Sequence, residues 1–126
     1  MKIMKILVVD DDSLLRTLLT RYLKDHLDVQ VVGMAETGSE AVRLAKEFKP
    51  DIVIMDVQLP DTDAPTLIGK LKSISPTAKM YLCSAYADEK IEAMVGQIGA
   101  KGFISKSNLK NGLALILQSE RSTSPG

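Results

Sequence analysis

The chain has 126 residues, of which 45% are hydrophobic and 25% charged. This length is typical of a single domain, and the composition excludes a mainly disordered protein. The 16 basic and 16 acidic residues balance, so no overall charge attracts the chain to nucleic acid or to an anionic membrane. No apolar run is long enough to span a bilayer, and residues 1–5 do not resemble a signal peptide. We therefore expect a cytoplasmic protein without direct nucleic-acid or membrane contact.

Five short runs of apolar and β-branched residues predict five strands. These runs are Lys5–Val9, Val29–Met34, Ile52–Met55, Lys79–Cys83 and Gly102–Ser105. Three of them are almost continuously apolar, which is typical of strands that are covered on both faces. The runs therefore predict a parallel sheet. Cys83 is the single cysteine, which excludes an internal disulfide, and we expect it to be a small buried strand residue.

Segments with helical periodicity separate the strands, and two of them come early in the chain. An apolar stripe is expected on the first, from Leu14, Leu15, Leu18, Leu19, Tyr22 and Leu23. The second opens with Thr37 and Glu40, spaced as a capping box in which each side chain bonds the backbone N–H of the other residue. Its apolar face is expected to contain Ala41, Val42, Leu44, Ala45 and Phe48.

Three further helices are predicted, and their expected starts are Pro65, about Asp88 and near Ser107. The fixed φ of Pro65 suits a first helical turn, and Gly99 is expected to follow the fourth helix in a left-handed conformation. The alternation predicts an α/β protein, a doubly wound (βα)₅ fold with helices on both faces of the sheet. We place this domain at residues 1–119. Residues 120–126 are expected to form a linker or a disordered tail.

Polar side chains follow four of the predicted strands. They are Asp10, Asp11 and Asp12 after the first strand, Asp56 after the third, Ser84 after the fourth and Lys106 after the fifth. In open α/β sheets ligands bind at this edge. Crowded carboxylates repel one another unless a cation is present, and oxygen ligands of this kind suit Mg²⁺, with Mn²⁺ as a substitute. A carboxylate such as Asp56 can also accept a phosphoryl group, whose oxygens Ser84 and Lys106 could bind.

Each of these residues also has a simpler structural interpretation. An acidic run after a strand is more often a helix N-cap, and this is the role that we expect for Asp12. An isolated aspartate such as Asp56 can begin a turn, and most lysines are solvated. The shared position of these side chains at one edge of the sheet favours the functional interpretation.

Four segments together resemble the response-regulator receiver family, namely Leu7–Asp11, Ile54–Pro60, Ser84–Ala85 and Gly102–Lys106. The resemblance extends from Ile3 to about Ser119. It implies a flavodoxin-like fold, a three-layer sandwich with strand order 2-1-3-4-5. It also implies that Asp56 accepts a phosphoryl group from a sensor histidine kinase or a phosphotransfer protein. The implied Mg²⁺ ligands are the carboxylates of Asp10, Asp11 and Asp56 and the backbone carbonyl of Gln58.

The same resemblance implies a conformational switch. Ser84 matches the switch hydroxyl of the family, and Phe103 matches its switch aromatic. Phe103 on a buried strand could also be a core residue, but the resemblance favours the switch. The output surface would be formed by the fourth helix, the fifth strand and the fifth helix. It would control an attached effector domain or a partner protein, with transcription regulation as the expected output and phosphorylation-dependent homodimerisation as an option. Such a domain catalyses only its own phosphorylation and slow dephosphorylation, and is no conventional enzyme.

The chain departs from the family pattern at two places. The acidic loop is followed by Asp63, Ala64 and Pro65 where a glycine is frequent, which predicts an extended Ala64 and a stiffer loop. Ser107 stands where many members have a cis-proline, as in receivers of NarL/LuxR-type DNA-binding regulators, which the chain also resembles. Two further positions, Gln58 and Tyr86, are expected to flank the phosphoryl site and tune access to it.

Three other functions are compatible with parts of the pattern. The first is a receiver-like interaction module that signals without phosphorylation. The second is a phosphohydrolase with Asp56 as nucleophile, which is disfavoured because Gln58 stands where such enzymes commonly have a second acid. The third is a flavin-binding domain, which is disfavoured because the acidic run after the first strand would repel phosphate. His26, the single histidine, is expected to be solvated and is no credible phosphodonor.

Overall fold

The computed structural model describes residues 2–85 and 89–123. Over these residues the strands are β1 (Met4–Val9), β2 (Val29–Ala35), β3 (Ile52–Asp56), β4 (Lys79–Ser84) and β5 (Gly102–Ser105). The helices that alternate with them are α1 (Ser13–Leu23), α2 (Gly38–Phe48), α3 (Ala64–Ile74), α4 (Glu89–Gln97) and α5 (Leu109–Thr123). The predicted alternation is therefore confirmed, with every strand bound within one residue of the expected one.

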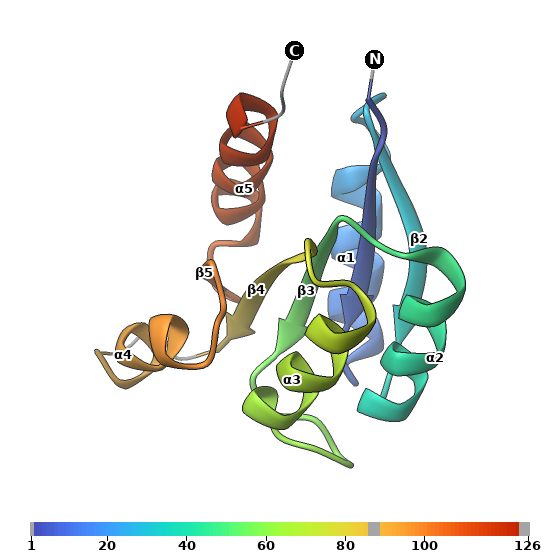
Figure 1. Cartoon of the computed structure of the whole chain (residues 1–126). Coiled ribbons are helices and arrows are strands. Elements are labelled where there is room, and N and C mark those ends of the chain that lie inside the picture. Colours follow the sequence, from blue (N-terminus) through green and yellow to red (C-terminus); the bar gives the residue numbers. More distant parts are fainter. Residues whose placement is uncertain (1, 86–88, 124–126) are drawn as a thin grey trace.

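All strands of the sheet are parallel, in the order β2-β1-β3-β4-β5 (Figure 1). The order confirms the flavodoxin-like fold. The last residue of β1, Val9, pairs with Met55 of β3, which puts the carboxyl ends of these two strands side by side. In β4, Ser84 pairs with Ser105 of β5. The residues that follow β1, β3, β4 and β5 therefore emerge at one edge of the sheet, where the strand order reverses between β1 and β3.

Helices cover both faces of the sheet, and the alternation along β1 shows how. Ile6 and Val8 pack with buried residues of α1 and α5, whereas Leu7 and Val9 pack with those of α2 and α3. All four side chains are fully buried, and each such burial stabilises the fold by about 1.5–3 kcal/mol relative to an exposed side chain. Figure 1 shows α2 and α3 in front of the sheet and α1 behind it. These layers confirm the three-layer sandwich.

The apolar stripe predicted for α1 is only half buried. Leu15, Leu19 and Leu23 form a buried row at a spacing of four residues, but Leu14 is 65% exposed and Leu18 is 45% exposed. The prediction was wrong for these two residues because one row of a short helix contacts the sheet, and the neighbouring row turns away from it. Phe48, at the end of α2, is likewise exposed.

The expected capping box at the start of α2 forms only in part. Thr37 Oγ1 accepts a hydrogen bond from the backbone N–H of Glu40 at 3.1 Å, as predicted. The Glu40 carboxylate instead accepts from the backbone N–H of Glu36 at 3.2 Å, one residue before the expected partner. The Glu40 side chain therefore binds the residue that follows β2 and does not cap the N–H of Thr37.

Helix α3 begins at Ala64, one residue before the expected start. Asp63 is its N-cap and has the extended backbone, and its carboxylate accepts from the N–H of Thr66 at 2.8 Å. The expectation of an extended Ala64 was wrong, because the helix start and the burial of the Ala64 methyl group outweigh the bias that Pro65 imposes. Pro65 lies in the first turn of the helix, where its missing N–H costs nothing.

Helix α4 is the least packed helix of the fold. None of its residues from Glu89 to Gln97 is buried, and its contacts to the core come from the partly buried Met94 and Val95. It lies beside the edge strand β5 (Figure 1). The left-handed conformation predicted for Gly99 is confirmed, with a φ of 85°. The expected start at Asp88 lies outside the described residues.

Helix α5 begins later and continues further than predicted. It starts at Leu109, because Ser105, Lys106 and Ser107 first form a turn in which the N–H of Asn108 donates to the carbonyl of Ser105 at 3.0 Å. It ends at Thr123, so residues 120–123, which were expected in a linker or tail, are helical. The described part of the chain has only trans peptide bonds, including the bond into Ser107. No described helix is long and apolar enough to cross a membrane.

Candidate functional site

Three carboxylates converge at the carboxyl edge of the sheet. Asp10 and Asp11 directly follow β1, and Asp56 is the last residue of the neighbouring strand β3. One carboxylate oxygen from each residue lies within 4.8 Å of the other two. Because β1 and β3 pair in register up to Val9 and Met55, the local fold holds these charges together despite their repulsion. The structure thus brings together the three acids that the sequence predicted.

Asp10 is the most deeply buried of the three acids, at 1% exposure. Its Oδ1 accepts the N–H of Asp12 at 2.8 Å. Its Oδ2 lies 3.1 Å from Lys106 Nζ but has no donor in hydrogen-bonding geometry among the described residues. Burial raises the pKa of Asp10 above its usual range, the charge of Asp56 adds to this effect, and the Asp12 N–H and Lys106 oppose it. Lys106 therefore compensates the buried Asp10 carboxylate only in part.

Lys106 reaches across from the end of β5 to both buried acids. Its Nζ lies 2.8 Å from Asp56 Oδ2 and 3.1 Å from Asp10 Oδ2. Its backbone N–H donates to the carbonyl of Ser84 at 2.8 Å, which fixes the start of the side chain. Burial alone would lower the pKa of Lys106, but the two carboxylates outweigh burial and raise this pKa. The ammonium group is thus a fixed positive charge beside Asp56.

Asp56 has a partner at each oxygen. Oδ1 accepts the N–H of Gln58 at 3.1 Å, and Oδ2 accepts from Lys106. Gln58 itself is exposed and forms an isolated antiparallel bridge with Asp63. Asp11 is exposed as well, so the acid cluster is buried on the side of Asp10 and open to solvent on the side of Asp11.

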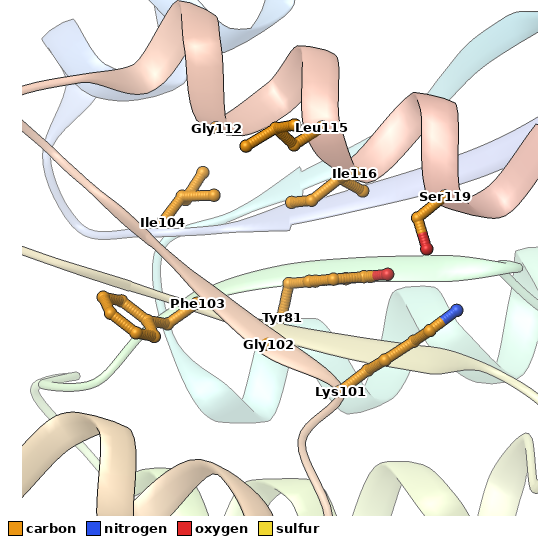
Figure 2. Close-up of a pocket in the computed structure, with 9 residues that line it drawn as sticks. All are labelled: Tyr81, Lys101, Gly102, Phe103, Ile104, Gly112, Leu115, Ile116 and Ser119. Carbon is orange, nitrogen blue, oxygen red and sulfur yellow. The ribbon is translucent and has the colours of Figure 1, made fainter.

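The two predicted switch residues lie on neighbouring strands. Ser84 is buried at the end of β4 and pairs in register with Ser105 of β5. Phe103 of β5 is partly buried, and it borders a pocket between β4, β5 and α5 (Figure 2). Figure 2 shows Tyr81 of β4 and Ile116 of α5 at the same pocket. The predicted access residue Tyr86 lies outside the described residues.

Arg16 of α1 is a site residue that the sequence reasoning missed. Its Nη1 donates to the backbone carbonyl of Asp10 at 2.7 Å, and its Nη2 pairs with Glu36 at 3.0 Å. The Arg16 side chain is 13% exposed. Asp12 acts as the predicted N-cap of α1 and accepts from the N–H of Leu14 at 3.0 Å. The available signal was the position of Arg16 one helical turn after this N-cap, which directs its side chain back towards the sheet edge.

The donor set fits a hard divalent cation. Three carboxylates offer oxygen atoms within a few ångströms of one another, and the buried Oδ2 of Asp10 lacks a hydrogen-bond donor among the described residues. Mg²⁺ is typically held by one or two carboxylates and completes its coordination with water and phosphate oxygens. Cys83 lies close by but is buried, and burial raises the pKa of its thiol to about 12, so it offers no thiolate at neutral pH. A metal ion at this edge of the sheet would therefore be bound by oxygen atoms and not by sulfur.

The chain matches a sequence-family model described as the response regulator receiver domain, over residues 6–118. Response regulator GacA from Pseudomonas aeruginosa is 38% identical to it over 102 residues, which are 81% of this chain and 48% of that protein. The chain thus spans about half the length of GacA. Chemotaxis protein CheY from Listeria monocytogenes is 38% identical over 103 residues, which are 82% of this chain and 86% of CheY.

Solved structures agree with this assignment. The signal receiver domain of the response regulator NarL from Mycobacterium tuberculosis superposes with a TM-score of 0.86 at 26% identity, covering 98% of this chain and 100% of that domain. The isolated receiver domain of RcsB from Salmonella enterica has a TM-score of 0.88 at 19% identity, which supports the fold alone. The family model, the relatives and the converging acids lead to one conclusion: the chain belongs to the response regulator receiver domains of two-component systems.

Proposed function

We propose that Asp56 accepts a phosphoryl group in a Mg²⁺-dependent reaction, with a sensor histidine kinase or a phosphotransfer protein as donor. The observation that carries the proposal is the position of Lys106, whose Nζ lies within 3.1 Å of carboxylate oxygens of both Asp56 and Asp10. A lysine in this place can neutralise charge on a group that is attached to Asp56. We also propose that the protein is located in the cytoplasm.

In the proposed reaction an oxygen of Asp56 attacks the phosphorus atom of a phosphohistidine. The phosphorus–nitrogen bond breaks, its electron pair stays on the donor imidazole, and that nitrogen then takes up a proton. The product is an aspartyl phosphate. Asp10, Asp11, Asp56 and the backbone carbonyl of Gln58 would hold Mg²⁺, which supplies charge neutralisation when bound. Lys106 binds a phosphoryl oxygen, and Ser84 donates its hydroxyl hydrogen to another.

The output would follow from a shift at the edge of the sheet. Movement of Ser84 towards the phosphoryl group would let Phe103 change its rotamer and alter the surface of α4, β5 and α5. The loose packing of α4, which has no buried residue, supports its role as the element that moves. We propose that this surface controls an effector domain or partner protein, in a regulator of transcription, and that it can also form a phosphorylation-dependent dimer.

The phosphoacceptor role is tested by incubation with acetyl phosphate and Mg²⁺, followed by intact-protein mass spectrometry. We expect an adduct of one phosphoryl group on the wild type and none on Asp56→Ala. The matched control is Asp25→Ala, which removes an exposed aspartate outside the site and should leave the adduct unchanged. An adduct that persists in Asp56→Ala, or a wild type that forms none, would contradict the proposal.

A further inference from the structure

The loop between β3 and α3, residues 57–63, is bound at its tip to the start of α2. Asp61 Oδ1 accepts the backbone N–H of Gly38 at 2.8 Å, and Asp61 Oδ2 accepts that of Ser39 at 3.0 Å. These N–H groups belong to the first turn of α2 and have no acceptor within the helix. Thr37 satisfies the next N–H, that of Glu40. A carboxylate from a distant loop therefore completes the N-terminus of this helix.

Gly38 permits the close approach of loop and helix. It is buried, and a Cβ atom at this position would lie only 2.4 Å from Thr62 Cγ2 and 3.4 Å from Asp61 Oδ1. Real Cβ atoms do not approach other atoms to 2.4 Å, so any larger residue at position 38 would displace Thr62. The requirement for glycine here is one of space. The contact is thus tight on both sides, with two hydrogen bonds to Asp61 and van der Waals packing of Thr62.

The same loop carries Gln58 and is fixed near its two ends. The N–H of Gln58 donates to Asp56 Oδ1 at 3.1 Å, and Gln58 forms a bridge with Asp63. Asp63 in turn caps α3 through the N–H of Thr66. Asp61, three residues after Gln58, supplies a further attachment, which connects the loop to the neighbouring helix α2. Without it the first part of the loop would still be held, since the N–H of Val57 donates to the carbonyl of Cys83 in β4 at 3.2 Å, but the tip would lose its hydrogen bonds to α2.

We infer that Asp61 is a positioning residue for the Mg²⁺ site, because docking the loop on α2 holds the backbone carbonyl of Gln58 where a cation at Asp56 can bind it. The inference rests on the proposed function of this edge. A loop that is already ordered loses little freedom when the ion binds, whereas an undocked loop has to be ordered at that moment. Loss of the docking contact should therefore weaken Mg²⁺ binding.

Two substitutions on different elements break this contact in independent ways. Asp61→Ala removes both acceptors together with one negative charge. Gly38→Ala leaves every charge in place and displaces Thr62, so it separates loop position from electrostatic attraction. We expect each variant to raise the Mg²⁺ dissociation constant by about tenfold, as when a group that orients metal ligands is removed. The measurement is titration of the full chain with MgCl₂ by isothermal calorimetry.

The design includes a rescue and a charge control. Thr62→Ala removes the methyl group that a Cβ at position 38 would meet, so Gly38→Ala combined with Thr62→Ala should recover most of the wild-type affinity. Glu47→Ala removes an exposed carboxylate of α2 and should change the affinity by less than about twofold, because exposed charges are screened. Wild-type affinity in both Asp61→Ala and Gly38→Ala, or no detectable Mg²⁺ binding by the wild type, overturns the inference.

A second readout separates this positioning role from a general loss of stability. With acetyl phosphate as donor, the variants should need more Mg²⁺ for half-maximal phosphorylation but reach the wild-type rate at saturation. A reduced plateau with an unchanged Mg²⁺ midpoint would contradict the inference. The calorimetric result does not depend on phosphorylation, so the two proposals can fail separately. A wild type that binds Mg²⁺ but is not phosphorylated overturns the proposed function, whereas phosphorylation with unchanged Mg²⁺ binding in the variants overturns the role of Asp61.

Discussion

Arg121 in the last turn of α5 binds both carboxylate oxygens of Asp28, which lies 93 residues earlier in the connection between α1 and β2. Its Nε lies 2.6 Å from Oδ2, and its Nη2 lies 2.7 Å from Oδ1. The same Nη2 lies 3.2 Å from His26 Nδ1, so His26 faces Arg121 and is not simply solvated. This bidentate pair connects the end of α5 to the residue directly before β2.

The Asp28 pair should stabilise the protein only above acidic pH. Hydrogen bonds from Arg121 lower the pKa of Asp28, burial opposes this effect, and the charge of Arg121 adds to it. A carboxyl group whose pKa is lower in the folded state stabilises the fold above its unfolded pKa of about 3.9, and this contribution is lost as the pH falls through the folded value. We expect Asp28→Asn to cost about 0.5–1 kcal/mol at pH 7, and to cost nothing at a pH below the folded pKa.

Urea unfolding of both proteins at pH 7 and at strongly acidic pH measures this difference. The matched control is Asp25→Asn, because Asp25 is an exposed aspartate in the same connection between α1 and β2. This substitution should leave the free energy of unfolding unchanged at both pH values. An equal cost of Asp28→Asn at both pH values would contradict the prediction.

Glu120 should contribute more to stability than its place near the end of the chain suggests. Its buried Oε2 accepts from Tyr81 Oη of β4 at 2.5 Å and from Lys101 Nζ. Burial, with help from Glu120, raises the pKa of Tyr81 well above its usual range, so the phenol stays a donor. Because Glu120→Ala would leave the buried Tyr81 hydroxyl without this acceptor, we expect it to lower the free energy of unfolding by roughly 2–3 kcal/mol.

The comparison for Glu120 is Glu47→Ala, which makes the same change on a helix at an exposed ion pair with Arg43 and should cost less than about 0.5 kcal/mol. Urea unfolding of the two variants gives both values. Similar costs for the two substitutions would show that the buried network adds little.

Asp10→Asn should stabilise the protein in the absence of Mg²⁺. Burial and the neighbouring Asp56 raise the pKa of Asp10, which means that its charged form is disfavoured in the folded state. Stability from such a group is present below its unfolded pKa of about 3.9 and is lost as the pH rises through the folded value. At pH 7 in EDTA we therefore expect the variant to melt a few degrees above the wild type, with no difference at strongly acidic pH.

Addition of Mg²⁺ should reduce or reverse this difference in melting temperature, because we expect the ion to stabilise the folded wild type and to bind the variant more weakly. Thermal unfolding monitored by circular dichroism, with and without MgCl₂, tests both statements. A variant that melts below the wild type in EDTA would show that Asp10 is already adequately neutralised by Lys106.

Two glycines at the end of α4 should respond to alanine in opposite ways. Gly99 has a φ of 85°, a conformation that an alanine adopts only under strain, so Gly99→Ala is expected to cost about 1 kcal/mol. Gly96 is helical, and a Cβ there would meet nothing within 4 Å, so Gly96→Ala should stabilise the protein by up to about 1 kcal/mol. Chemical denaturation measures both, and a neutral Gly99→Ala would contradict the left-handed assignment.

Much of the fold could be predicted from the sequence because hydrophobic periodicity reports burial directly. The apolar runs gave every strand, and the carboxyl ends of the strands gave Asp10, Asp11, Asp56 and Lys106 as one cluster. Helix ends were less predictable, because they depend on local competition. Asp63 caps α3, so that helix begins at Ala64 and not at Pro65, and the turn before α5 delays the start of α5 to Leu109.

The groups that support the site could not be predicted, because each depends on a partner that only the tertiary fold supplies. Asp61 lies 23 residues from Gly38, whose N–H it accepts. The position of Arg16 one turn after the N-cap was the only signal in the sequence, and it did not identify the Asp10 carbonyl as the partner of this side chain. The Ser, Thr, Pro and Gly content of residues 119–126 predicted a linker or tail, whereas the contacts of Glu120 and Arg121 with distant residues hold the last turn of α5 in place.

The position of Lys106 between Asp10 and Asp56 affects how strongly this edge of the sheet can bind a metal ion. The lysine already acts as an internal counterion for the carboxylate oxygens that an incoming ion needs. If Mg²⁺ binds here as proposed, it would compete with Lys106 for these oxygens, and its binding free energy would be the difference between two sets of contacts. Such a site would respond modestly to ionic strength, since the competing charge is held by the protein itself. Binding of the ion would also release the ammonium group from part of its anchorage before a phosphoryl group arrives.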